Sequence, residues 1–331
     1  MDTCFPVTHS ILSADALASD VLPRYGLGPI DAVRFLNPGL NDTYVVEAAS
    51  GEQYILRVYR RNWRTFEDIA YEVDVLNHLS NKGASVSTPI PQQDGDFIQT
   101  VPAPEGDRHV VLFDYAKGKL AARGKSDSEA LNYGKAAAII HNAAQDFSSK
   151  YKRFTLDLTH LVDTPTEIMR PVFSRRNDDW EYLQQLIKKV RHELDELPIG
   201  DLEQGFCHGD LHGGNAHSDD DGQIKFFDFD CGGWGWRAYD IAVFQWANII
   251  SREERKKSLW DFFLRGYAEE RSLSALDLRA VPLFVFLRYY WLLGLHTGNA
   301  HDWGNGHLDR MLDWAIKGFR ELEKDYFSDP E

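Results

Sequence analysis

The chain has 331 residues, which is long enough for two domains with buried cores. Its 36 Lys and Arg residues are outnumbered by 51 Asp and Glu residues, giving a formal net charge of −15. This excess of acids argues against a protein that binds nucleic acid or an anionic membrane surface through clustered cations.

Cysteine content and apolar runs indicate the compartment. Three cysteines without a CxxC pair support neither a disulfide framework nor a zinc knuckle. The chain does not start with a basic segment followed by an apolar run, so the sequence does not predict a secretory signal. The longest apolar runs fall far short of the ~20 residues that span a bilayer. We therefore expect a cytoplasmic protein.

The first hundred residues have the pattern of an antiparallel sheet. Thr43–Ala49 and Gln53–Tyr59 are rich in Tyr, Val and Ile and flank a Gly-containing turn, which predicts a hairpin. A further strand is predicted over His109–Phe113. Apolar residues at helical spacing predict a helix over Phe66–Leu79, and Glu72 falls inside its apolar arc. An acid at that position predicts a buried partner.

From Asp127 onward the pattern changes to long helices, interrupted over Phe206–Asp230 by short β-type pieces around a Gly- and His-rich loop. Glycines and polar residues in Asp114–Lys125 indicate the connection between two parts. We therefore predict an α+β protein with an N-terminal lobe over residues 1–115 and a larger, mostly helical C-terminal lobe over residues 116–331. The helices of the C-terminal lobe are predicted over Glu129–Phe147, Asp178–Leu197, Ser258–Arg271, Leu278–Leu295 and Leu308–Phe327.

The densest group of chemically active residues lies in Cys207–Asn215 and is followed by Ile224–Asp230. Asp210 and Asn215 are five residues apart on one tight loop, and Asp228 ends a short apolar strand. One carboxylate can orient and deprotonate a hydroxyl, while an amide oxygen and a second carboxylate can hold Mg²⁺, which prefers hard oxygen ligands. These are the parts that phosphoryl transfer requires.

These motifs resemble those of a known family. His208-Gly209-Asp210, followed after four residues by Asn215 and later by Asp228-Phe229-Asp230, is similar to the Brenner-type motif pair of the aminoglycoside phosphotransferase and choline kinase superfamily. Trp236–Ala242 resembles the segment after that superfamily's metal aspartate. The resemblance implies a bilobal fold like that of eukaryotic protein kinases, and transfer of the ATP γ-phosphate to a hydroxyl.

The resemblance also implies roles for residues in these motifs. Asp210 would be the catalytic base, and Asn215 and Asp228 would be the Mg²⁺ ligands. We expect Asp240 to anchor the catalytic loop by accepting hydrogen bonds from its backbone, rather than to act as an acid. The role of Asp230 stays open: it could bind a metal or the substrate, or it could cap the loop.

In the N-terminal lobe the resemblance implies the nucleotide contacts. Arg57 aligns with the strand that carries the nucleotide-contacting lysine, and Glu72 would be its partner on the helix. Arginine in place of lysine keeps the positive charge but spreads it over a planar fork, which changes the phosphate geometry.

The resemblance also implies a phosphate loop and an adenine-binding hinge. The loop would lie over Asn37–Thr43, with Gly39 and Asn41 as its contacts, and it has one glycine rather than a glycine-rich run. Phe113 and Tyr115 would belong to the hinge, which binds adenine through backbone groups.

Three alternatives stand beside a small-molecule kinase. His208 and His212 could hold a transition metal in a hydrolase, but the loop is interrupted by glycine and a third ligand cluster is not obvious, so we expect both to brace the loop. A protein Ser/Thr kinase of the bacterial stress-response type resembles the same superfamily, and Leu287–Leu292 is similar to a segment of that group. A non-catalytic nucleotide-binding module is disfavoured because the base and both metal ligands are present together.

The sequence does not identify the acceptor. Aminoglycosides, amino alcohols such as choline and ethanolamine, and homoserine-like compounds would all use the same phosphate machinery. The sequence also leaves open whether the nucleotide is ATP or GTP, and whether the protein is a monomer or a homodimer. The excess of acids predicts a negative cleft beside Asp210, Asp228 and Asp230, which favours a cationic alcohol as the acceptor.

Overall fold

The computed structural model of the protein describes residues 5–37, 39–121, 126–250 and 255–327. The chain divides into two compact units. The N-terminal unit contains the chain up to Gly118 together with the later segments Asp146–Arg153 and Lys225–Asp230, and the C-terminal unit contains the rest. The boundary predicted from the sequence, at residues 115/116, lies close to Gly118, where the chain first passes from the N-terminal unit to the C-terminal unit. The two later segments are not visible in the sequence pattern, because only long-range contacts assign them to the N-terminal unit.

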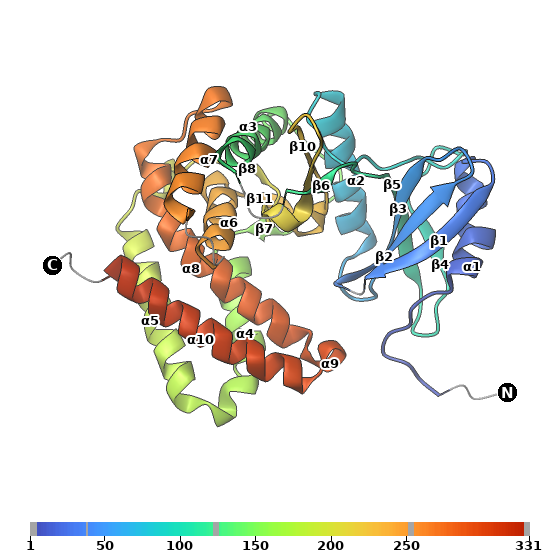
Figure 1. Ribbon diagram of the computed structural model, residues 1–331. Coiled ribbons are helices and arrows are strands. Elements are labelled where there is room, and N and C mark those ends of the chain that lie inside the picture. The colour runs from blue at the N-terminus through green and yellow to red at the C-terminus, as the bar shows by residue number, and fades with distance from the viewer. Residues whose placement is uncertain (1–4, 38, 122–125, 251–254, 328–331) are drawn as a thin grey trace. The chain divides into compact units, whose positions relative to one another are not determined.

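A five-stranded antiparallel sheet forms the N-terminal unit, with the strand order β1-β2-β3-β5-β4 and the long helix α2 (Figure 1). The predicted hairpin, helix and strand all form. A capping box begins α2, since Thr65 accepts from the Asp68 amide and Asp68 accepts from the Thr65 amide. The elements are α1 (Ala14–Ala16), β1 (Ile30–Asn37), β2 (Asn41–Ala48), β3 (Gln53–Tyr59), α2 (Phe66–Asn81), β4 (Gln99–Val101) and β5 (Arg108–Asp114).

The strand β1 is not predicted by the sequence analysis. It lies at the edge of the sheet, its side chains are half-buried or exposed, and irregularities interrupt its register with β2. An edge strand buries too little surface to show the strict alternation that marks a strand in a sequence.

The core of the N-terminal unit lies on one face of this sheet. Tyr44 and Val46 alternate along β2, and Leu56 and Val58 alternate along β3. All four are completely buried against apolar side chains of residues 17–25. Because successive side chains of a strand point to opposite faces, Arg57 is carried on the other face, where it contacts α2 through Glu72.

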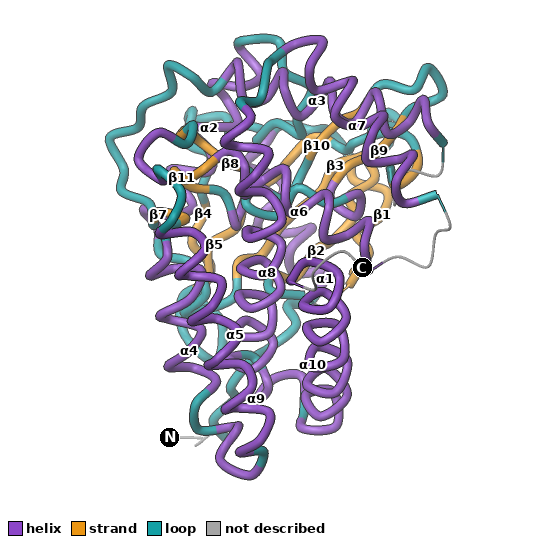
Figure 2. The backbone as a smooth tube through the Cα atoms, turned by 90° about the vertical axis from the view of Figure 1, so that its left-hand side faces the viewer, coloured by secondary structure: helices purple, strands orange, loops and turns teal. Residues whose placement is uncertain are grey.

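Helices dominate the C-terminal unit, and α8 lies at its centre. This helix packs against α4, α5, α6 and α10, and Figure 2 shows α5, α8 and α10 running alongside one another. Two small sheets complete the unit: β11 pairs with β7 and β8, and β6 pairs with β9. The elements after Gly118, including β10, whose residues are divided between the two units, are β6 (Lys119–Leu120), α3 (Asp127–Ala143), β7 (Thr155–Leu156), α4 (Thr164–Met169), α5 (Asn177–Asp195), β8 (Gln204–Cys207), β9 (Ala216–Ser218), β10 (Ile224–Phe226), β11 (Gly233–Trp236), α6 (Arg237–Ile250), α7 (Lys256–Glu270), α8 (Ala275–Gly298), α9 (Ala300–Trp303) and α10 (Asn305–Phe327).

The sequence analysis does not predict three helices of this unit, α4, α6 and α9, and α8 is more apolar than the sequence analysis expects. The first seven residues of α6 are all buried, including Arg237 and Asp240; a helix buried on every side lacks an amphipathic period. Among the described residues, α8 is the one helix long and apolar enough to cross a membrane, but 72% of its most apolar window is buried inside the protein. It is therefore the core helix of this unit.

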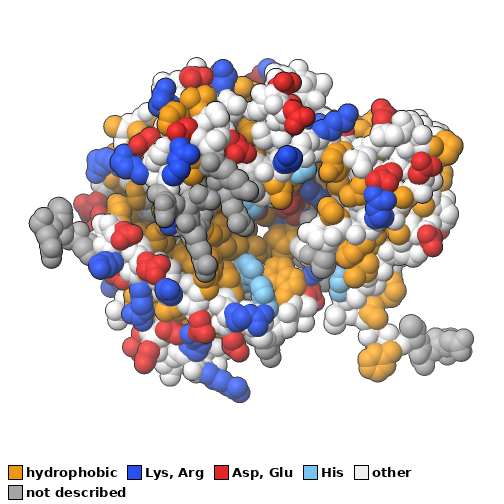
Figure 3. Space-filling model, viewed as in Figure 1, with side chains coloured by type: hydrophobic (Ala, Val, Ile, Leu, Met, Phe, Trp, Pro, Cys, Tyr) orange, Lys and Arg blue, Asp and Glu red, His pale blue; other side chains and the backbone are white. Residues whose placement is uncertain are grey.

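The acidic excess is not gathered in one patch on the face shown in Figure 3. Lys and Arg side chains are interspersed with Asp and Glu side chains over that face. Mixed charges of this kind keep a surface soluble without producing a strong local field.

Candidate functional site

The predicted catalytic loop lies between β8 and β9 in the C-terminal unit. Its path depends on Gly209, which has φ +77°, a conformation that glycine adopts without strain. A Cβ atom at this position would lie 2.1 Å from the Cys231 carbonyl oxygen, so a side chain cannot be accommodated. The loop therefore packs directly against the backbone that follows Asp230.

The buried residue Asp240 anchors this loop. Its Oδ2 accepts a hydrogen bond from the His208 amide at 2.6 Å, and its Oδ1 accepts one from the Gly209 amide at 2.7 Å. His141 Nε2 lies 3.1 Å from Oδ2, and burial lowers the pKa of His141 although the hydrogen bond to Asp240 acts in the opposite direction. The predicted anchoring role of Asp240 is confirmed.

Asp210 is held at both carboxylate oxygens. Oδ1 forms an ion pair with Arg288, and Oδ2 accepts a hydrogen bond from Asn215 Nδ2 at 2.8 Å. Its side chain is about one-fifth exposed. Burial acts to raise the pKa of Asp210, but the charges of Arg288 and His212 outweigh it and hold the pKa far below its usual range. Asp210 is therefore ionised near neutral pH and is primarily a strong hydrogen-bond acceptor.

The sequence analysis misses Arg288, which lies 78 positions beyond Asp210 on α8. One signal was present: Arg288 is a single cation in an otherwise apolar and aromatic run of residues. A buried charge needs a partner of opposite sign. The same argument that predicts a partner for Glu72 could have been applied here, but it would not have identified Asp210 as the partner.

The two histidines of the loop make local contacts. His208 Nδ1 accepts from the Asp210 amide at 3.3 Å, and His212 Nδ1 accepts from the Gly214 amide at 2.9 Å. These contacts agree with the predicted bracing role. Within the described ranges, we find no group of three or more His, Cys, Asp and Glu side chains that could hold a metal ion.

A second cluster of predicted residues lies in the N-terminal unit, around Arg57. Its Nη1 lies 2.8 Å from Glu72 Oε1, and its Nη2 lies 3.0 Å from Asp228 Oδ1. The hydroxyl of Tyr59 donates to the other oxygen of Glu72 at 2.8 Å, so this buried acid is held by two partners. The predicted pairing of Arg57 with Glu72 is confirmed. Burial acts to lower the pKa of Arg57, but Asp228 and Glu72 raise it well above its ordinary value.

Asp228 combines exposure with an unusual backbone. Its φ is +67°, in the left-handed region that few residues other than glycine adopt, and its side chain is 40% exposed. The preceding Phe226 is tied to the N-terminal unit by backbone hydrogen bonds to Ser85 and Ser87. A strained, exposed carboxylate on a fixed segment is typical of a functional position.

The structure assigns contacts to Asp230, whose role the sequence leaves open. Its Oδ2 accepts from Asn41 Nδ2 at 2.7 Å and from Trp63 Nε1 at 2.8 Å, and its carbonyl accepts from Arg64 Nε at 2.7 Å. The residue is 3% exposed. It therefore ties the predicted phosphate loop to the segment that carries Asp228.

The remaining predicted residues belong to the same unit. The Gly39 carbonyl accepts from Arg60 Nη2 at 2.7 Å, which fixes the loop; the neighbouring position 38 lies outside the described residues. Phe113 is on β5 with its ring 5.0 Å from the Arg57 guanidinium, and Tyr115 follows the end of this strand. The amide of Asp114 donates to the Thr88 carbonyl at 2.9 Å, so part of the proposed hinge backbone is already paired.

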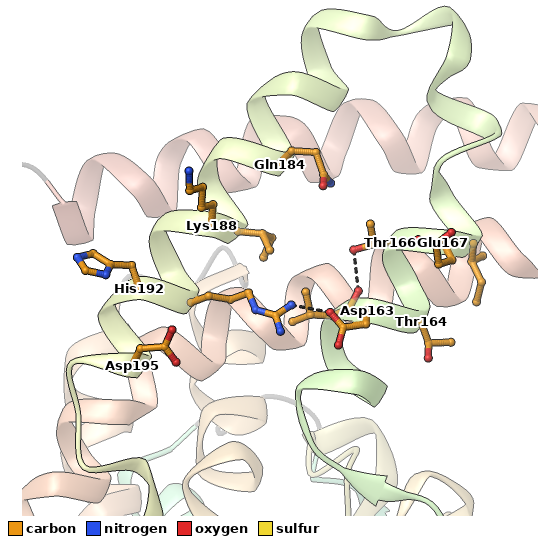
Figure 4. Close-up of a pocket in the computed structure, with 12 residues that line it drawn as sticks. Asp163, Thr164, Thr166, Glu167, Gln184, Lys188, His192 and Asp195 are labelled. Carbon is orange, nitrogen blue, oxygen red and sulfur yellow. Dashed lines mark hydrogen bonds and ion pairs between the residues drawn. The ribbon is translucent and has the colours of Figure 1, made fainter.

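A separate cavity of about 810 Å³ lies between α4 and α5 in the C-terminal unit (Figure 4). The residues lining it carry both signs of charge, and Arg191 forms an ion pair with Asp163 at 2.5 Å. None of the predicted site residues lines it. Its volume alone does not make it the reaction site, because the groups with the chemistry for transfer lie elsewhere.

The comparison with family descriptions identifies the class of protein. The phosphotransferase enzyme family matches residues 32–276, and the chain belongs to this family. Its fold is therefore the kinase-like fold of aminoglycoside phosphotransferase structures, and its activity is that of a small-molecule kinase that transfers phosphate to a hydroxyl.

Individual relatives cover nearly the whole chain. An uncharacterized protein of Deinococcus radiodurans is 40% identical over 324 residues, covering 97% of this chain and 93% of the relative. The amicoumacin kinase of Bacillus subtilis is 27% identical over 311 residues, covering 86% of this chain and 85% of the relative.

Solved structures show the same fold. A microcompartment-associated aminopropanol kinase is similar with a TM-score of 0.75 and 26% identity, over 94% of this chain and 97% of the other. An amicoumacin kinase in complex with AMP-PNP, Ca²⁺ and amicoumacin is similar with a TM-score of 0.70 and 23% identity, over 93% of this chain and 95% of the other. The second likeness supports the fold alone.

Proposed function

We propose that this kinase uses Mg²⁺ and ATP to phosphorylate the hydroxyl of a small cationic amino alcohol, with Asp210 as the catalytic residue. The observation that carries the proposal is the state of Asp210: an ionised, partly exposed carboxylate, held by Arg288 and Asn215 on a loop anchored by Asp240. A group fixed in this way suits the positioning of a nucleophile.

The proposed transfer needs little covalent work from the protein. The acceptor oxygen forms a bond to the γ-phosphorus while the bond to the bridging oxygen of ADP breaks, and the hydroxyl proton passes to Asp210. Because the transition state of such transfers is loose, orientation of the hydroxyl matters more than strong basicity. The low pKa of Asp210 agrees with a group that orients first and accepts the proton late.

Asn215 and Asp228 offer oxygen atoms of the kind that Mg²⁺ prefers, so their chemistry fits the metal. Asn215 donates hydrogen bonds from its Nδ2 to Asp210, and its amide oxygen would therefore be the atom that binds a cation. Asp228 shares one oxygen with Arg57 and remains 40% exposed. The bound metal would neutralise charge on the β- and γ-phosphates.

The N-terminal residues would bind the nucleotide. Arg57 would contact phosphate, with Glu72 fixing its position, and the loop at Gly39 and Asn41 would cover the phosphates. Phe113 and Tyr115 would mark the segment that receives adenine. The contacts of Arg57 with Glu72, and of Asn41 with Asp230, support these assignments because they pre-organise the groups concerned.

Two observations favour an amino alcohol among the acceptors. The aminopropanol kinase is similar to this chain over 94% of its length. The net charge of −15 favours a cation over an anion in the encounter with the protein.

A screen tests the proposal. The full-length protein is incubated with Mg²⁺ and ATP and a panel that includes aminopropanol, ethanolamine, choline, homoserine, amicoumacin, spectinomycin and a generic protein substrate, and ADP release is measured. We expect the highest kcat/KM with a cationic alcohol, and a fall in this value as salt is raised to about 0.15 M. The Asp210→Asn variant should lose on the order of 10²–10⁴-fold in kcat while still binding nucleotide. A neutral or protein acceptor preferred by a wide margin, or full turnover by the variant, would contradict the proposal.

A further inference from the structure

Arg288 is a deeply buried cation that contacts the proposed catalytic residue and has no function of its own in the proposed mechanism. Its side chain is 2% exposed, whereas the carboxylate that it pairs with is about one-fifth exposed. The arginine therefore approaches Asp210 from the protein interior, and the accessible part of the carboxylate stays free for a substrate. Its Nη1 also lies 3.5 Å from the Gly209 carbonyl, so Arg288 contacts the loop at two consecutive residues.

Two tryptophans fix the plane of this guanidinium. Its carbon atom lies 5.0 Å from the ring centre of Trp246 on α6 and 5.0 Å from that of Trp291 on α8. Trp291 is held in turn by a hydrogen bond from its Nε1 to His160 Nε2 at 3.1 Å. Cation–π contacts of this kind restrict a planar arginine more than the flexible ammonium group of a lysine.

We propose that Arg288 is a positioning residue for phosphoryl transfer: it holds one oxygen of Asp210 so that the other is presented to the acceptor hydroxyl. This inference rests on the proposed catalytic role of Asp210. Asn215 Nδ2 contacts Oδ2 and the Asp210 carbonyl, and His212 Nε2 lies 3.4 Å from Oδ2, whereas Arg288 is the partner of Oδ1. A shift of about 1 Å in a reacting group can lower a rate on the order of 10²-fold, so the loss of this contact should reduce turnover rather than nucleotide binding.

A purely structural role for Arg288 makes different predictions. In that case its replacement would lower the melting temperature, but each folded molecule would turn over at the normal rate. Its effect on the rate would also be independent of the residue at position 210. The two roles can therefore be separated by combining substitutions at both positions.

The experiment compares Arg288→Met and Arg288→Lys with wild type, using the best acceptor from the screen and, in parallel, Mg²⁺-dependent ATP hydrolysis with water as acceptor. Arg279→Met is the matched control, because Arg279 lies on the same helix and is exposed. We expect Arg288→Met to lower kcat by about 10- to 100-fold with the KM for ATP nearly unchanged. Arg288→Lys should recover part of the loss, since it restores the charge but not the planar stacking. The Arg279 control should match wild type.

The double variant provides the decisive comparison. If Arg288 acts through Asp210, then adding Arg288→Met to Asp210→Asn causes no further loss of rate, and it lowers the melting temperature much less than it does in the wild-type background. A kcat for Arg288→Met within about twofold of wild type, or fully multiplicative losses in the double variant, overturns the inference.

Three further outcomes are also assigned. If Asp210→Asn keeps wild-type turnover, the proposed catalytic role of Asp210 is wrong. If Asp210→Asn is inactive but Arg288→Met is fully active, only the positioning role of Arg288 is wrong. If Arg288→Met does not fold, recovery of folding in the Arg288→Met/Asp210→Asn double variant, with a reduced kcat in Arg288→Lys, supports the inference. No recovery, with normal kcat in Arg288→Lys, contradicts it.

Discussion

Each unit of the protein buries an arginine that holds a carboxylate of the predicted site, but the two arginines are attached differently. Arg57 forms ion pairs with two acids, the buried Glu72 and the 40% exposed Asp228. The Arg288 guanidinium lies 5.0 Å from each of two tryptophan ring centres and is paired with Asp210. In the proposed function, Arg57 would exchange its exposed partner for a phosphate while Glu72 keeps it in place, whereas Arg288 would keep its partner throughout the reaction. The comparison separates a group that binds from a group that positions.

The largest effect should follow from removing Asp228, the exposed partner of Arg57. We expect Asp228→Ala to abolish phosphate transfer and to weaken Mg²⁺·ATP binding by on the order of 10²-fold or more, because the phosphate charges lose their metal. Isothermal titration with ATP, with and without Mg²⁺, measures the change. Asp220→Ala is the control, since Asp220 is an exposed acid on the preceding turn. Equal Mg²⁺·ATP affinity in wild type and Asp228→Ala would show that Asp228 is not the ligand.

A second test examines whether Glu72 serves Arg57 alone. Arg57→Ala and Glu72→Ala should each lower kcat/KM for ATP by about tenfold or more, and the double variant should lose little beyond the larger single effect. The reason is that Glu72 acts by orienting Arg57, to which it is joined at 2.8 Å. Steady-state kinetics of the four proteins give the coupling energy. Losses that multiply would mean that the two residues act separately.

A smaller effect should follow from loosening the phosphate loop. Asn41→Ala removes a hydrogen bond to the buried Asp230 carboxylate, a contact of about 1.5–3 kcal/mol for a charged acceptor. We expect the KM for ATP to rise by about three- to tenfold with a small change in kcat, since in the proposed function the loop covers the phosphates and does not position the acceptor. Trp63→Phe removes the other donor to the same oxygen and is the matched comparison. An unchanged KM in both variants would remove the loop-holding role of Asp230.

The smallest effect concerns stability on the helix that carries Arg288. Burial, together with the neighbouring His307 and Arg288, lowers the pKa of His296 from 6.5 to about 4. A folded-state pKa below the unfolded value means that the neutral form stabilises the fold above about pH 6.5, and this contribution is lost as the pH falls toward about 4. We therefore expect the melting temperature of wild type to fall between about pH 7.5 and 5 more steeply than that of His296→Gln. Parallel slopes in differential scanning calorimetry would contradict this.

Local patterns allowed much of the N-terminal unit to be predicted from sequence. The hairpin and α2 show their period in short windows, and Arg57 and Glu72 are only 15 positions apart. An acid on an apolar helical arc needs a buried partner, and the family resemblance implies that Arg57 is that partner. The anchoring role of Asp240 could be predicted for a similar reason. Asp240 is only 32 and 31 positions from His208 and Gly209 in the sequence, and buried acids commonly accept backbone hydrogen bonds.

The features that the sequence did not reveal depend on tertiary contacts. The edge strand β1 and the buried helix α6 lack the periodic burial by which a pattern is recognised. Lys225–Asp230 joins the N-terminal unit through long-range pairing, at separations such as 77 positions to Arg153 and 189 positions to Asn41. The partners of Asp230 and the link from Arg288 to Asp210 likewise span long separations.

The sequence alone thus determined the kinase-like class, because the motifs that carry the family resemblance are short, and the same motifs supply the residues proposed to transfer phosphate. Only the tertiary structure decided which cation holds Asp210 and what Asp230 contacts. The physical reason is that a buried charge requires a partner of opposite sign, but any of several distant residues can meet this requirement until packing selects one.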